Sequence, residues 1–309
     1  MIVSEPEVEE VETAPRQRSR RQKVFAVLPT LLTLCNAVCG FGAITIIARV
    51  GPDSFAGGDQ QLVLAAQLIF LAMLFDALDG SAARLTNQAS EFGAQLDSLC
   101  DVVSFGVAPA YLMLTLTHPE HHLLSVHQLN QQLIEDNANL IFAWHPRVLW
   151  SIAVLYMACA ILRLARFNVE TDDDDSHDSF SGLPSPAAAG VIVSFPLAIR
   201  FLTAVDLTKA SVLVRNLTVN VLAALAMTLP LIALATAILM VSRIRYPHVF
   251  NQFLRGQRNR SHVLQLVFFL ALVLVAWELA VPVIFCYFAF NAPMRAVWRR
   301  YIWKQPAAV

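Results

Sequence analysis

Long apolar runs set the limits on what this chain can fold into. A helix needs about 20 apolar residues to cross the hydrocarbon core of a bilayer, and six runs here reach that length. We expect membrane helices at about residues 25–48, 61–85, 94–117, 147–168, 185–204 and 217–242. Hydrophobic residues make up 57% of the 309 residues and charged residues 15%, against about 25% charged in a typical soluble domain. The sequence therefore predicts an all-α polytopic membrane protein.

A further apolar run, residues 262–294, allows two interpretations. One long tilted helix would leave the basic C-terminal tail on the outer side of the membrane. Two short helices, with a turn between Glu278 and Pro282, would return that tail to the inner side. We expect the two short helices, and therefore eight spans.

Charged segments divide the chain outside these runs. We expect a disordered charged tail at residues 1–23 and a six-helix membrane domain at residues 24–243. A basic loop at residues 244–261, additional membrane helices at residues 262–294 and a basic tail at residues 295–309 would follow. The first apolar run is too long for a cleavable signal peptide. The net charge is −1, and we expect no nucleic-acid partner. The five cysteines lie in apolar runs, so we expect packing thiols rather than disulfides.

The distribution of basic residues predicts the orientation. The N-terminal segment and the 243–260 loop carry five basic residues each, whereas the predicted outer loops hold only Lys209 and Arg215. By the positive-inside rule the N-terminus is then cytoplasmic. The helix ends near residues 76–101 and 163–166 would face the cytoplasm as well.

Four carboxylates stand out because they lie between apolar runs, where ionisable residues are expensive and usually functional. Asp76 and Asp79 are three residues apart and Asp97 and Asp101 four apart, so each pair shares one helix face. If the two faces meet, four like charges converge, and such a cluster persists only around a cation. Oxygen ligands alone favour a hard divalent ion. We therefore expect Mg²⁺ or Mn²⁺, with two ions in the site.

The spacing of this stretch, D-x2-D-G-x2-A-R-x8-G-x3-D-x3-D from Asp76 to Asp101, resembles the signature of the CDP-alcohol phosphatidyltransferases at every fixed position. Two further stretches, LRLARFNV and GLPSPAAAG, resemble the phosphatidylserine synthase branch of that family. In the first apolar run, Pro29, Thr33 and Asn36 match a Pro-Asn-x2-Thr-x2-Asn pattern of that branch. Thr30 stands where the pattern has asparagine, which removes one polar contact to the nucleotide.

The resemblance implies a six-helix core, with one or two C-terminal helices added here, that transfers a phosphatidyl group from CDP-diacylglycerol to an alcohol and releases CMP. Asp76, Asp79, Asp97 and Asp101 would hold metal, with Asp101 also the general base. The residues expected to bind the CDP-lipid are Thr33, Asn36, Gly80, Ala83, Arg84 and Gly93. The branch implies L-serine as the acceptor, a homodimer and a place in the bacterial inner membrane.

The end of the fourth apolar run offers a physical counterpart for serine. Arg163 and Arg166 lie three residues apart, and with Asn168 they can bind a carboxylate through charge-assisted hydrogen bonds. The alternative for these arginines is that they snorkel to lipid head groups. The same fold could also use glycerol 3-phosphate or an inositol phosphate as the acceptor. A transporter or a lipid-binding scaffold is the non-enzymatic alternative.

Overall fold

The computed structural model describes residues 20–50, 58–86, 91–117, 144–170, 179–204, 211–247 and 277–302. Helices dominate this part of the chain. They are α1 (Arg20–Ile47), α2 (Gly58–Thr86), α3 (Glu91–Asp101), α4 (Ala108–Thr117), α6 (Pro146–Glu170), α7 (Ser185–Val193), α8 (Phe195–Thr203), α9 (Val212–Val241) and α12 (Trp277–Ile302). A π-helical segment, η1 (Val102–Val107), joins α3 to α4, and two short strands, β1 (Ser179–Ser181) and β2 (Arg245–Pro247), pair antiparallel.

Seven helical stretches in the described ranges are long and apolar enough to cross a membrane. They are Leu28–Ile47, Gln60–Ala82, Glu91–Thr117, Pro146–Val169, Ser185–Thr203, Val212–Val241 and Trp277–Arg295. Their positions agree with the six runs predicted from the sequence and with part of the C-terminal run. The chain is therefore an all-α integral membrane protein, as predicted.

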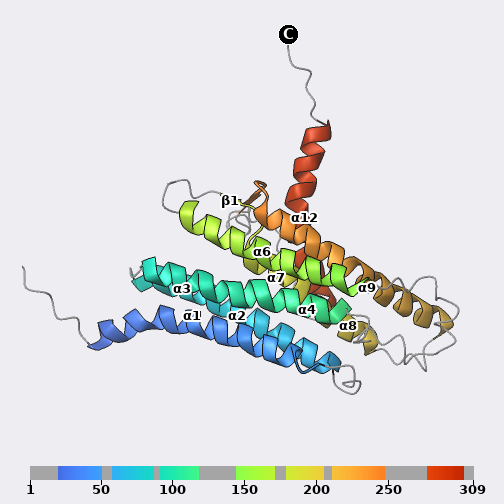
Figure 1. Cartoon of the computed structure of the whole chain (residues 1–309), viewed down its shortest axis with the longest axis horizontal. Coiled ribbons are helices and arrows are strands. Elements are labelled where there is room, and N and C mark those ends of the chain that lie inside the picture. Colours follow the sequence, from blue (N-terminus) through green and yellow to red (C-terminus); the bar gives the residue numbers. More distant parts are fainter. Residues whose placement is uncertain are drawn as a thin grey trace, which may run out of the picture.

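The helices from α1 to α9 run roughly along one direction, while α12 crosses them at a steep angle and its C-terminal part extends away from the bundle (Figure 1). The helices α1 and α2 pack against each other, and both contain small buried residues. The fully buried ones are Ala43, Ala65, Ala66 and Ala72. Small side chains let helix backbones approach closely, which drives helix association in lipid.

The third span is continuous but not uniformly α-helical. The segment η1 contains Gly106 and ends at Val107, two residues before Pro109. The main-chain N–H of Ala108 donates to the carbonyl of Val103, five residues earlier, as in a π-helix. Single π turns inside membrane helices are frequent at functional sites.

The fifth span is broken at Ser194 into α7 and α8. Pro196 is the second residue of α8, and because proline has no N–H it cannot continue the hydrogen bonds of α7. The Ser194 hydroxyl instead donates to the carbonyl of Val191 at 2.7 Å.

The prediction of a turn between Glu278 and Pro282 is wrong. The structure has one helix, α12, which passes through Pro282 and ends at Ile302. Proline is tolerated in membrane helices where neighbouring groups compensate for the lost hydrogen bond, and α12 packs against α7 and α8. Residues 262–276 lie outside the described residues, so the number of spans beyond the seven stays a prediction. Of the charged tail predicted to be disordered, residues 1–23, residues 1–19 also lie outside the described residues. The prediction is wrong for residues 20–23, because α1 begins at Arg20 and includes them.

Candidate functional site

Three of the four predicted carboxylates converge at one end of the bundle. Asp76 comes from the last part of α2, and Asp97 and Asp101 come from α3. One carboxylate oxygen of each lies within 4.8 Å of the corresponding oxygens of the other two. The i, i+4 spacing on α3 places Asp97 and Asp101 on the same face, and α2 brings Asp76 to that face.

Asp79 lies beside this group but makes a different contact. Its side chain is 5% exposed, and its Oδ2 accepts a hydrogen bond from the Thr33 hydroxyl of α1 at 2.7 Å. It is close enough to interact electrostatically with Asp76 and Asp97. The fourth carboxylate is therefore held by the first span, next to the other three.

The first span also holds Asp101. The amide Nδ2 of Asn36 donates to Asp101 Oδ1 at 2.9 Å, and Asn36 is fully buried. Thr33 and Asn36 are three residues apart and share one face of α1. The structure thus turns the polar side chains of Thr33 and Asn36 toward the carboxylates.

The residues present fit a hard divalent cation. Three carboxylates this close repel one another strongly unless a positive charge lies between them. In the described part of the chain, Asp97 Oδ1 is buried and has no hydrogen-bond donor. Carboxylate oxygens alone are the donor set that Mg²⁺ and Mn²⁺ prefer. The unpartnered oxygen of Asp97 and the crowding of the three carboxylates therefore both indicate a divalent cation as the ligand.

Arg163 of α6 faces this cluster, where its charge acts on both Asp76 and Asp101. Its guanidinium NH1 donates to the Ser185 hydroxyl at 2.6 Å, and its Cζ lies 5.9 Å from the centre of the Phe167 ring. Among the described residues its Nε is buried without a hydrogen-bond partner. Arg163 is therefore turned inward rather than snorkelling to the head groups.

Ser185 is a residue that the sequence analysis missed. It is fully buried at the first position of α7. The only local signal is a serine flanked by two prolines, which predicts a helix start but no partner. Its contact with Arg163 joins α6 to α7 at the carboxylate end of the bundle.

The other two predicted acceptor residues lie further along α6. Asn168 Oδ1 accepts a hydrogen bond at 3.1 Å from the hydroxyl of Ser98, the neighbour of Asp97. Arg166 is half-buried and also interacts with a neighbouring group. All three residues therefore come from the α6 end that approaches α3.

The remaining predicted CDP-lipid-binding residues lie in the last part of α2 and the first turn of α3. A methyl group on Gly80 would meet no heavy atom within 4 Å, so space is open there. Gly93 lies in the first turn of α3. The side chains of Ala83 and Arg84 lie outside the described part of the structure, and their roles stay predictions.

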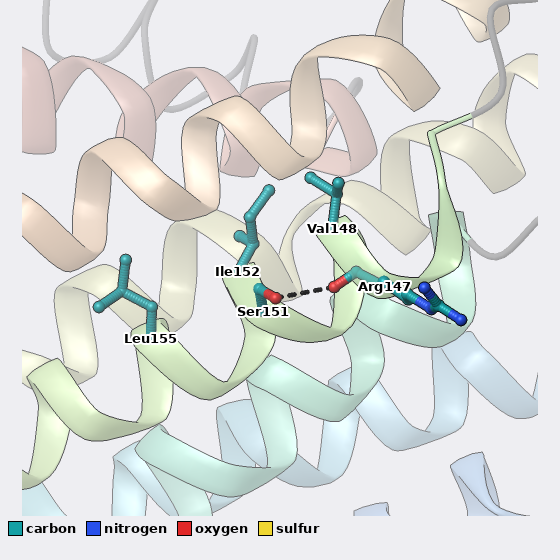
Figure 2. A pocket seen from close by; sticks show the side chains of 5 residues that line it. All are labelled: Arg147, Val148, Ser151, Ile152 and Leu155. Carbon is teal, nitrogen blue, oxygen red and sulfur yellow. Dashed lines mark hydrogen bonds between the residues drawn. The ribbon is translucent and has the colours of Figure 1, made fainter.

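A cavity of about 250 Å³ lies at the other end of α6 (Figure 2). It is lined by Arg147, Val148, Ser151, Ile152 and Leu155. The Ser151 hydroxyl donates to the main-chain carbonyl of Arg147, so it is already satisfied within the helix. This cavity is separated from the carboxylates by several turns of α6, and it contributes no group to them.

A family model for CDP-alcohol phosphatidyltransferases matches residues 26–292, which include every described residue of the site. Two archaeal relatives match most of the chain. A CDP-diacylglycerol–serine O-phosphatidyltransferase of Methanocaldococcus jannaschii is 32% identical over 222 residues, 72% of this chain and 77% of the relative. An archaetidylserine synthase of Methanothermobacter thermautotrophicus is 32% identical over 227 residues, 73% of this chain and 71% of the relative.

Bacterial relatives match a shorter stretch. A CDP-diacylglycerol–serine O-phosphatidyltransferase of Mycobacterium tuberculosis is 30% identical over 178 residues, 56% of this chain and 50% of the relative. The chain thus matches about half the length of the mycobacterial relatives.

Proposed function

The chain belongs to the CDP-alcohol phosphatidyltransferase family, and on that premise we propose that it transfers the phosphatidyl group of CDP-diacylglycerol to the hydroxyl of L-serine. The products are phosphatidylserine and CMP. The observation that carries this proposal is the convergence of Asp76, Asp97 and Asp101 within 4.8 Å, beside a buried Asp79. A pyrophosphate substrate is the kind of ligand that needs such a cation site.

The four aspartates would hold the divalent ions, Mg²⁺ or Mn²⁺, and we propose two of them. When bound, the ions neutralise charge on the leaving phosphate and polarise the attacked phosphorus. Thr33 keeps Asp79 oriented through its hydrogen bond. The carboxylates thereby meet the ions in a fixed arrangement, which lowers the cost of organising the site during the reaction.

Asp101 takes the proton of the serine hydroxyl. Asn36 donates to its Oδ1, which leaves Oδ2 as the oxygen for the proton. The hydroxyl oxygen attacks the phosphorus that bears the lipid, a new P–O bond forms, and the P–O bond to CMP breaks. CMP leaves with the bridging oxygen. No covalent enzyme intermediate is needed, because donor and acceptor are held together.

Arg163 supplies the positive charge that recognises the serine carboxylate. The Ser185 hydroxyl holds its NH1, and its Nε is left for a ligand. Arg166 and Asn168 would complete the acceptor site at the end of α6. The names of the archaeal relatives differ in the lipid but share serine as the head group, which supports serine as the acceptor.

The reaction would take place on the cytoplasmic side of a bacterial inner membrane, where serine is available. The basic residues before the first membrane span, Leu28–Ile47, and after α9 support this orientation. We further propose that the enzyme is a homodimer, as the family resemblance implies. A cysteine-accessibility assay on a residue after Ile302 would report the side of the C-terminal tail.

The test is CMP release by the purified protein in liposomes that contain radiolabelled CDP-diacylglycerol and Mn²⁺. We expect release on addition of L-serine, with phosphatidylserine as the lipid product. Transfer to glycerol 3-phosphate or an inositol phosphate, with serine ignored, would keep the reaction and reject the acceptor. Absence of CMP release with every alcohol would favour a scaffold or a transporter.

A further inference from the structure

The π-helical segment η1 begins at the residue after Asp101, so its shape sets the end of the helix that presents this carboxylate. Ser104 lies inside η1 and is fully buried. Its hydroxyl donates to the main-chain carbonyl of Asn36 at 2.9 Å. Asn36 is the same residue whose side chain donates to Asp101 Oδ1. One residue of α1 is therefore tied to the third span at two points.

Gly40 makes this approach possible. In an α-helix the carbonyl of residue 36 points toward residue 40, so the Ser104 hydroxyl must enter the space beside Gly40. A Cβ atom on Gly40 would overlap Ser104 Oγ and would lie 2.8 Å from Ser104 Cα. Any larger residue would therefore push η1 away from α1.

A second hydrogen bond holds η1 from the opposite helix. The hydroxyl of Tyr156 on α6 donates to the carbonyl of Phe105 at 3.3 Å, and both residues are fully buried. Tyr156 precedes Arg163 by seven residues, two turns of α6, so both lie on one face. The α6 face that carries Arg163 thus also fixes the π turn.

From these contacts we infer that Ser104 is a positioning residue for Asp101, with Gly40 as the space it requires and Tyr156 as a second support. The inference rests on the proposed function, because Asp101 is the group whose direction is being set. Ser104 acts by keeping Asn36 and η1 in register, so that the Asn36 amide meets Asp101 Oδ1 and Oδ2 points to the acceptor. It touches neither substrate.

The matched variants are Ser104→Ala and Ser194→Ala, each of which removes a buried hydroxyl that donates to a main-chain carbonyl. We expect Ser104→Ala to lower kcat about 10-fold, with KM for CDP-diacylglycerol changed less than about 2-fold, because small misplacements of a reacting group are costly. Ser194→Ala should keep kcat near the wild-type value. Both should melt at similar temperatures in detergent.

A second pair of variants tests the space beside Gly40 rather than the hydrogen bond of Ser104. Gly40→Ala should lower kcat by about 100-fold, since it moves the backbone that carries Asp101. Gly42→Ala on the same helix should leave kcat unchanged, because its methyl would lie 3.4 Å from the mobile end of the Leu68 side chain. If Gly40→Ala does not fold, the comparison of kcat between Ser104→Ala and Ser194→Ala is the test of the inference.

The outcomes separate this inference from the proposed function. A folded Ser104→Ala variant with wild-type kcat would overturn the inference and leave the proposed function intact. A parallel loss of melting temperature and kcat in both serine variants would also overturn it, since that pattern is purely structural. A wild-type protein that releases no CMP with any alcohol would overturn both.

Discussion

Two helix junctions in this protein are both tightly packed, but polar side chains form one and apolar side chains form the other. At the carboxylate end, α1 meets α2 and α3 through the hydrogen bonds of Thr33 and Asn36 to aspartates. At the C-terminal junction, the ring of Phe285 on α12 fills the space over Gly190 on α7. Its centre lies 5.8 Å from the centre of the Phe70 ring, with the two rings tilted by 37°. One junction is polar and the other is apolar.

The two junctions also differ in whether their buried polar atoms have hydrogen-bond partners. The Tyr246 hydroxyl donates to the carbonyl of Ala289 at 2.9 Å, which satisfies the buried phenol beside α12. In contrast, the described neighbours of Asp97 Oδ1 and Asn36 Oδ1 give these buried oxygens no donor. A buried polar atom without a partner is costly. The polar junction is therefore shaped for a ligand, whereas the apolar junction is shaped for stability.

The largest expected effect is at Asp101. Asp101→Asn keeps the shape of the side chain and can still accept from Asn36, but it cannot take a proton at the acceptor. We expect kcat to fall by about 10³-fold or more, the range of a lost general base. Binding of CDP-diacylglycerol and the melting temperature should change little. A variant that keeps more than about a tenth of wild-type kcat would contradict the role of general base.

A smaller effect is expected at Asp76, the carboxylate that α2 contributes to the cluster. Asp76→Asn removes one charged oxygen ligand, so we expect the Mn²⁺ concentration for half-maximal activity to rise by about 10–100-fold, the scale of lost support at metal sites. Added Mn²⁺ should restore part of the activity. An unchanged Mn²⁺ dependence would place the ion elsewhere.

The apolar junction should respond in stability instead of chemistry. A methyl group on Gly190 would overlap the Phe285 ring, and overpacking of this kind costs about 1–3 kcal/mol. We expect Gly190→Ala to lower the melting temperature while kcat per folded molecule stays at the wild-type value. Gly42→Ala is the control, because its methyl would lie 3.4 Å from the flexible end of the Leu68 side chain. A Gly190→Ala variant that loses kcat without losing stability would contradict the assignment of the apolar junction to stability.

The smallest effect is expected at Tyr246. Tyr246→Phe removes the hydrogen bond to Ala289 and should cost about 1 kcal/mol of stability. Burial raises the pKa of the Tyr246 phenol to about 12. A pKa raised above its unfolded value means that this contribution is complete below about pH 10 and is lost as the pH rises through 12. The melting difference between wild type and variant should therefore shrink in that range, and a constant difference would contradict it.

Much of the fold could be predicted because its signals are local. Apolar runs of membrane length identified the helices, and the i, i+3 and i, i+4 spacings predicted that the carboxylates would share helix faces. Thr33 and Asn36 were singled out by their match to a family pattern within one apolar run. These patterns are periodic along one segment, so no knowledge of the partner segment was needed.

The rest depends on contacts between segments far apart in the chain. Nothing near Ser104 indicates that it meets Asn36, and nothing near Ser185 indicates that it meets Arg163. The expected turn at Pro282 failed because proline marks a helix end only when neighbouring helices do not compensate for its missing hydrogen bond. Such packing is decided by tertiary structure.

We propose that Asp76, Asp97 and Asp101 share a divalent ion. An experimental structure of protein soaked in Mn²⁺ tests it most directly, through the anomalous scattering of the metal. We expect a strong anomalous peak between these three carboxylates in the wild type and a weaker one in Asp76→Asn. A wild-type map with no peak there, at Mn²⁺ concentrations that support CMP release, would contradict it.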